Sequence, residues 1–92
     1  MGIYMVERLC PRTSIERLRD TQRAMIAMSL RFTARGEPIR YLRSTYIPGE
    51  SRCLCMFEAP QPESVKELNE VIQVPFIRII EVMEIAPEIT PE

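Results

Sequence analysis

The sequence predicts an α+β protein of the ferredoxin-like class, a four-stranded antiparallel sheet with two helices on one face. Three observations support this: the expected elements follow the order β-α-β-β-α-β, a short turn separates the two middle strands, and each helix lies between two strands. The chain has 92 residues, enough for one domain with one core. We expect that domain at residues 1–86 and a flexible Pro/Glu-rich tail at residues 87–92.

The first half of the chain predicts a strand followed by a long helix. Ile3–Cys10 is apolar and β-prone up to Pro11, which is typical of a strand. Thr13 and Glu16 have the spacing of a capping box, and Gly36 is a suitable helix stop because glycine tolerates a positive φ. The expected apolar stripe of this helix comprises Ile15, Leu18, Met25, Met28 and Phe32.

The second half predicts a hairpin, a shorter helix and a last strand. Two β-prone runs, Ile39–Ile47 and Arg52–Ala59, flank the turn signal Pro48–Glu50. The second helix opens with Pro and acidic residues in its first turn and ends before Pro75. Phe76–Ile85 is rich in Ile and predicts the last strand. The apolar stripe of the second helix comprises Val65, Leu68 and Ile72.

Composition and charge exclude several functional classes. Hydrophobic residues make up 46% of the chain and charged residues 27%, which is typical of folded globular proteins. No apolar run is long enough for a membrane span, and a formal net charge of −1 gives no general attraction for nucleic acid. Histidine is absent, which removes the usual general base and the commonest metal ligand. We therefore expect no nucleic-acid partner, no membrane partner and no His-dependent catalysis.

The three cysteines are Cys10, Cys53 and Cys55, and their odd number predicts free thiols. Together with the lack of a recognisable secretory signal, this predicts a reducing, cytoplasmic location. Cys53 and Cys55 are candidate metal ligands, because thiolates suit soft or borderline metals such as zinc and nickel, and Glu7 could complete the shell. Burial in the core is the alternative for these thiols, since free cysteine is among the most buried residue types.

Side-chain alternation along the strands divides the predicted sheet into two faces. The parity assigned to the helix-covered core comprises Val6, Leu42, Leu54, Met56, Ile80 and Val82. The residues of the other parity form the open face of the sheet, which is also apolar yet carries charges near its middle. We therefore expect a homodimer in which two open sheet faces enclose a barrel-like cavity. The open-face residues are Ile3, Met5, Glu7, Leu9, Tyr41, Arg43, Thr45, Cys53, Cys55, Phe57, Ile77, Ile79, Glu81 and Met83.

Polar side chains that point into this expected cavity form a candidate ligand site. Glu7, Arg43 and Glu81 would orient a polar ligand, and Tyr41 would add a phenolic donor. A carboxylate desolvated in such a cavity is suited to general acid–base work. The same charges have a second interpretation, a buried salt bridge that fixes the register of the dimer.

Four strings occur in order along the chain: Tyr4–Arg8, Arg40–Ser44, Cys55–Pro60 and Ile80–Val82. In this order and spacing they resemble a family of small bacterial ferredoxin-like proteins, catalogued as a domain of unknown function and described as nickel-binding. The resemblance implies a dimeric α/β barrel, as in small monooxygenases, isomerases and stress-responsive proteins, with nickel or zinc as the candidate cofactor. The nickel-binding members rely on histidines, which this chain lacks, so their ligand set does not carry over.

The sequence thus favours a cytoplasmic homodimer that binds a metal ion or a small ligand between its sheets. Two alternatives stay open: a cofactor-free enzyme of the monooxygenase or isomerase type, and a structural, stress-associated dimer without a ligand. Basic residues of the first helix and acidic residues of the second are expected to neutralise one another on one solvated surface.

Overall fold

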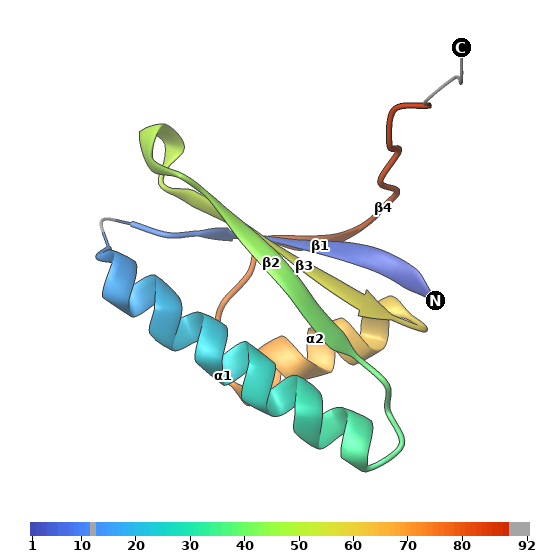
Figure 1. The fold of residues 1–92 in the computed structure, drawn as a ribbon. Helices are drawn as coiled ribbons and strands as arrows, with labels where there is room; N and C mark the ends of the chain where they lie inside the picture. The colour runs from blue at the N-terminus through green and yellow to red at the C-terminus, as the bar shows by residue number, and fades with distance from the viewer. Residues whose placement is uncertain (12, 89–92) are drawn as a thin grey trace.

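The structure is a computed structural model that describes residues 1–11 and 13–88. The four strands form one antiparallel sheet in the order β2-β3-β1-β4. Both helices cover the same face of this sheet, as Figure 1 shows, which confirms the predicted ferredoxin-like α+β fold. The elements are β1 (Gly2–Leu9), α1 (Ile15–Ala34), β2 (Arg40–Ile47), a 3₁₀ turn (Pro48–Glu50), β3 (Arg52–Ala59), α2 (Pro62–Val71) and β4 (Arg78–Val82).

Helix α1 is capped one residue later than the expected capping box. Ser14 has an extended backbone, and its Oγ accepts a hydrogen bond from the Arg17 N–H at 3.2 Å. The residue three places after this cap is Arg17, which cannot return the reciprocal bond that Glu16 was expected to make to Thr13. The prediction of a Thr13 cap is therefore wrong. Gly36 follows the helix with φ of 94°, as expected of a glycine stop.

The core lies between the helices and the sheet. Of the helical stripes predicted from the sequence, Met25, Phe32, Val65 and Leu68 are buried. Ile15 is 64% exposed because it lies in the first turn of α1, at the rim of a cavity. The buried apolar residues are Tyr4, Val6, Met25, Phe32, Ile39, Cys53, Cys55, Phe57, Ala59, Val65 and Leu68.

The register with β1 decides which side chains of β3 face the helices. Val6 is fully buried and pairs directly with Cys55, and cross-strand partners share a face. Cys53, Cys55 and Phe57 therefore lie in the core, and the expectation that they line the open face is wrong. The physical reason is that successive residues of β3 are all apolar, so its sequence does not show which side chains face the helices and which face away.

The open face gains four residues that were expected in the core: Leu54, Met56, Ile80 and Val82. Met5 pairs with Met56 and Ile80 across three neighbouring strands, so all three side chains point away from the helices. The assignment of Ile3, Met5, Glu7 and Leu9 to the open face is confirmed, because they alternate with buried residues of β1.

Strand β2 changes phase at a bulge between Tyr41 and Arg43. Tyr41 pairs with Phe57 on the helix-facing side, so its expected place on the open face is wrong. Arg43 and Thr45 lie on the open face as predicted, and Leu42 occupies the bulge, half-buried.

Strand β4 is shorter than the predicted run Phe76–Ile85. It pairs only with β1. Val82 lies opposite Ile3, and β1 begins at Gly2, so residues after Val82 have almost no strand left to pair with. Ile79 and Glu81 face the helix side, because they pair with Val6 and Tyr4, and their expected open-face position is wrong. Ile77 and Met83, also expected on that face, lie outside the strand.

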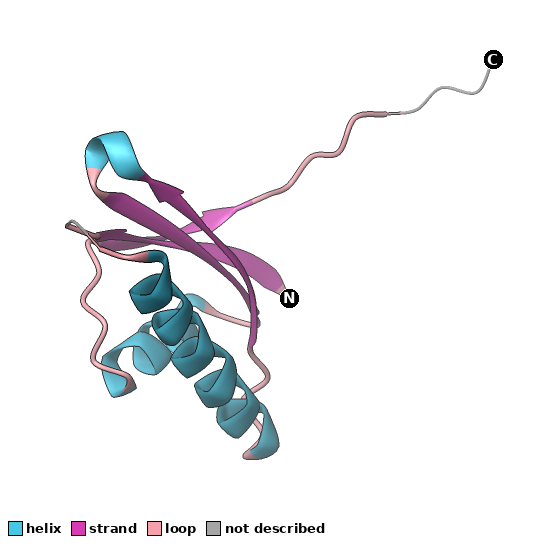
Figure 2. Ribbon diagram, turned by 60° about the vertical axis from the view of Figure 1, so that its left-hand side comes forward, coloured by secondary structure: helices cyan, strands magenta, loops and turns pink. Residues whose placement is uncertain are grey.

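The described residues after β4 extend away from the helices, as Figure 2 shows. Two apolar side chains of this segment, Met83 and Ile85, are 81% and 85% exposed. The tail predicted at residues 87–92 lies outside the described residues from residue 89 onward, and its flexibility stays a prediction.

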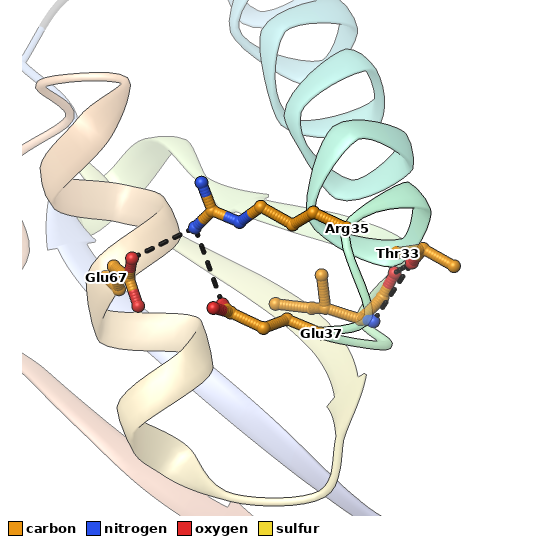
Figure 3. A network of polar contacts seen from close by, with 5 residues as sticks. Thr33, Arg35, Glu37 and Glu67 are labelled. Carbon is orange, nitrogen blue, oxygen red and sulfur yellow. Dashed lines mark hydrogen bonds and ion pairs between the residues drawn. The ribbon is translucent and has the colours of Figure 1, made fainter.

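The C-terminal end of α1 is tied to α2 and to the start of β2 (Figure 3). Arg35 contacts Glu67 of α2 at 3.0 Å and Glu37 at 3.5 Å. The Thr33 hydroxyl donates to the Ile39 carbonyl at 3.0 Å and accepts from the Ile39 N–H at 3.2 Å. The Arg35–Glu67 pair is one instance of the neutralisation expected between the two helices.

Candidate functional site

An ion cluster lies on the open face around Glu7 of the interior strand β1, toward the end of the sheet where β3 and β4 begin. The Glu7 residue is only 4% exposed. Its Oε1 accepts a hydrogen bond from Arg78 Nε at 2.6 Å, and its Oε2 pairs with Arg52. Arg52 also pairs with Glu50 at 2.9 Å. The two guanidiniums supply the partners that a buried carboxylate requires.

The charges expected around Glu7 are not the ones that the fold brings to it. Arg43 lies on the open face but pairs with Glu84, and Glu81 lies on the opposite side of the sheet, beside Tyr4 in the register. Arg52 and Arg78, the actual partners of Glu7, were not singled out from the sequence. Arg78 lies directly opposite Glu7 on β4, a relation that becomes visible only once the strand register is known.

The expected metal shell of Cys53, Cys55 and Glu7 does not form within one chain. Glu7 pairs with Leu54, which alternates with the two cysteines, so the carboxylate and the thiols lie on opposite faces. In the part of the chain that the structure describes, no group of three or more His, Cys, Asp or Glu side chains is placed to hold a metal ion. Metal binding by the thiols stays a prediction.

A second candidate site is a cavity of about 200 Å³ between the first turns of α1 and the helix-facing side of the sheet. Ile15 and Leu18 form an apolar wall, and the exposed side chains at the rim leave the cavity partly open to solvent. Its polar lining comes from three strands and the helix, and comprises Arg8, Arg19, Gln22, Ser44, Tyr46 and Cys53.

A chain of hydrogen bonds runs from α1 to the cysteines of β3. Gln22 Nε2 donates to the Tyr41 hydroxyl at 2.7 Å, and that hydroxyl lies 2.6 Å from Ser44 Oγ. Ser44 donates to Cys55 Sγ at 3.1 Å, and Cys53 lies two residues before Cys55 on the same face of β3. Two side chains predicted for an open-face ligand site, Tyr41 and Cys55, thus belong to one network on the helix side.

Arg8 places a positive charge beside these thiols. It is 4% exposed, and it pairs directly with Cys53 in the β1–β3 register. The neighbouring Cys55 thiol, together with the nearby Arg8 guanidinium, lowers the pKa of Cys53 to about 6 against the opposing effect of burial. The neighbouring Cys53 and burial raise the pKa of Cys55. The arrangement favours one thiolate, on Cys53.

Arg8 was not singled out from the sequence, although a signal for it existed. It shares the parity of Tyr4 and Val6 on β1, and both of those residues are buried in the core. An arginine on the core-facing parity of an interior strand indicates a buried charge with a specific partner or role.

In the part of the chain that the structure describes, no helix is both long and apolar enough to cross a lipid bilayer. The cytoplasmic location stays a prediction.

Comparisons with known proteins agree with the observed fold. The crystal structure of SCO4226 from Streptomyces coelicolor A3(2) matches with a TM-score of 0.78 at 19% sequence identity, and the match covers 92% of this chain and 100% of that one. At this identity the likeness shows the fold alone. A search of curated proteins gives no match. A family model described as nickel responsive protein SCO4226-like matches residues 4–82. The chain therefore belongs to the SCO4226-like family of nickel responsive proteins.

Proposed function

We propose that this protein works as a homodimer joined by its open sheet faces, and that the dimer binds a small polar ligand beside the Glu7 clusters. Its role would lie within the nickel response that the family description names. The observation that carries the proposal is an uncovered, largely apolar sheet face with an ion cluster around the buried Glu7 carboxylate toward one end of it.

The apolar side chains of this face are the first support. They come from the three neighbouring strands β3, β1 and β4, and each is half-buried within its own chain. A contiguous apolar patch on a folded chain is typical of an association surface. The residues are Ile3, Met5, Leu54, Met56, Ile80 and Val82.

The segment after β4 is the second support, and it argues for a second copy as the occupant. The segment after β4 extends away from the helices (Figure 2), and its two apolar residues, Met83 and Ile85, have more than four-fifths of their surfaces exposed. Glu84, between them, reaches Arg43 on β2, so this segment belongs to the open side of the sheet. Two-fold pairing would bury both apolar side chains of each copy against its partner.

A resident nickel ion does not fit the described residues of one chain. The chain has no histidine, and its cysteines face away from Glu7. Glu7 is held between two guanidiniums, which repel a cation. Arg52 Nε is buried and has no hydrogen-bond partner among the described residues, so it is a free donor for an oxygen atom. We therefore propose a ligand with acceptor groups.

The assembly is tested by light scattering on size-exclusion fractions of two matched variants. Met5→Lys puts a charge in the middle of the open face, and we expect it to yield a monomer with the secondary structure of the parent. Leu30→Lys puts the same charge on α1, where Leu30 is already 67% exposed, and should leave the dimer intact. A dimer in both variants would refute the proposed interface.

The ligand is tested by native mass spectrometry of the protein as purified. A dimer with an added mass that the Glu7→Gln variant lacks would support the proposed site. A dimer without added mass would refute the ligand and leave a structural dimer. Turnover of an added organic substrate that Glu7→Gln abolishes would instead favour the enzyme alternative.

A further inference from the structure

The cavity beneath α1 contains a buried positive charge that no carboxylate of residues 1–11 and 13–88 balances. Arg8 forms none of the ion pairs among the described residues. Its Nη1 is buried and has no hydrogen-bond partner there. Buried charges in proteins are normally paired, because an isolated one loses its hydration without compensation. A counter-charge is therefore expected within reach of Arg8.

The direction of the hydrogen-bond chain identifies that counter-charge. Gln22 donates through its amide nitrogen, so the Tyr41 oxygen accepts and the Tyr41 proton is free to go to Ser44. Ser44 donates to Cys55, so the Cys55 sulfur accepts and its own proton is free for a nearby acceptor. Cys53 lies on the same face of β3 and pairs directly with Arg8, so a negative charge on its sulfur would balance the buried guanidinium and accept from the end of the chain.

The position of Cys53 makes this thiolate reachable by small molecules. Cys53 is 1% exposed in the folded chain, yet it lines the cavity of about 200 Å³ together with Arg8. A cavity of that size admits only a small molecule. Arg8 and the hydroxyl of Ser44, both in the lining, can stabilise negative charge that develops on an oxygen atom there.

We propose that Cys53 is a reactive thiolate that a small hydroperoxide, entering this cavity, oxidises to a sulfenic acid. The sulfur attacks the terminal oxygen of the peroxide, so an S–O bond forms while the O–O bond breaks. Sulfur is oxidised and the peroxide is reduced. The departing alkoxide, or hydroxide when the peroxide is hydrogen peroxide, takes a proton from water. This site is separate from the open face and does not depend on the proposed dimer.

Cys10 provides an internal standard for the test. It is half-buried at the end of β1, more accessible than Cys53, and burial raises the pKa of its thiol. If accessibility alone governs oxidation, Cys10 reacts first. If the thiolate governs it, Cys53 reacts first.

The experiment treats the full chain with hydrogen peroxide in the presence of a 1,3-diketone that traps sulfenic acids, and peptide mass spectrometry gives the rate at each cysteine. We expect Cys53 to react at least about tenfold faster than Cys10 near pH 7, since one unit of pKa changes the thiolate fraction up to tenfold. Equal rates, or a faster Cys10, would overturn the proposal.

Variants test the role of Arg8. Arg8→Gln should slow oxidation of Cys53 about tenfold near pH 6. Arg23→Gln, which changes an exposed arginine of α1 that does not line the cavity, should leave the rate unchanged. An unchanged rate in a folded Arg8→Gln variant would overturn the proposal. If that variant does not fold, Ser44→Ala breaks the donor chain at a half-buried position and should slow Cys53 several-fold.

The pH dependence of alkylation by iodoacetamide is the second readout. The groups that face Cys53 are Arg8 from β1, Cys10 just after that strand, Cys55 from β3, Tyr46 from β2 and Arg19 from α1. Because the Cys53 pKa is lowered, its rate should fall as the pH drops through about 6. A midpoint at about 8.5, the value of an ordinary thiol, would contradict the proposal.

Discussion

The two faces of the sheet are built from the same strands but are held together by different interactions. On the helix-facing side, Cys55 and Phe57 are fully buried against α1 and α2. On the open side, Met56 between them is half-buried, and Glu7 is buried by the two arginines that pair with it. The helix-facing side therefore gains its stability within one chain, whereas the open side still has apolar surface to bury.

The largest expected effect comes from two neighbouring residues of β3. Phe57→Ala removes a fully buried ring and should lower the free energy of unfolding by about 3–5 kcal/mol. Met56→Ala, on the open side, should cost less than about 1.5 kcal/mol in dilute, monomeric protein. Urea denaturation measures both. Similar losses would mean that the two faces contribute equally to the free energy of unfolding of one chain, which would contradict the difference described above.

An intermediate effect is expected at the ion cluster. Glu7→Gln leaves Arg52 and Arg78 without their shared carboxylate, and we expect a loss of about 1–2 kcal/mol, because both arginines keep part of their hydration. The control is Glu58→Gln, which breaks the exposed pair with Arg40 and should cost less than about 0.5 kcal/mol. A Glu58 variant as unstable as the Glu7 variant would show that burial of the cluster is unimportant.

A smaller effect should distinguish the two faces of β2. Tyr41→Phe keeps the ring against Phe57 but removes the hydroxyl between Gln22 and Ser44, at an expected cost of about 1 kcal/mol. Thr45→Val, on the open face, should change the free energy of unfolding by less than about 0.5 kcal/mol. Thermal unfolding followed by circular dichroism resolves the difference, and a neutral Tyr41→Phe would argue against the donor chain.

The order of the elements could be predicted from the sequence because each one carries its own local signal. Pro62 at the start of α2, Gly36 after α1 and the Pro48–Glu50 turn mark boundaries that depend on a few residues each. The end of β4 could not be predicted this way. It depends on where the partner strand β1 begins, and that is set by the pairing register and not by the residues of β4.

The candidate sites could be predicted only in part, for the same reason. Glu7 was placed on the open face correctly, because its neighbour Val6 was assigned to the core and successive residues of a strand point to opposite faces. The cysteines were not, since Leu54 and Met56 beside them are as apolar as they are. A bulge at Tyr41 cannot be read from composition either, and it turns that side chain toward the helices.

The proposed interface joins the open faces of two copies of this chain. Sedimentation equilibrium on the unmodified protein measures the mass of the assembly in solution. We expect a species of twice the 10.7 kDa chain mass at micromolar concentration. A mass of one chain across the whole concentration range would contradict it.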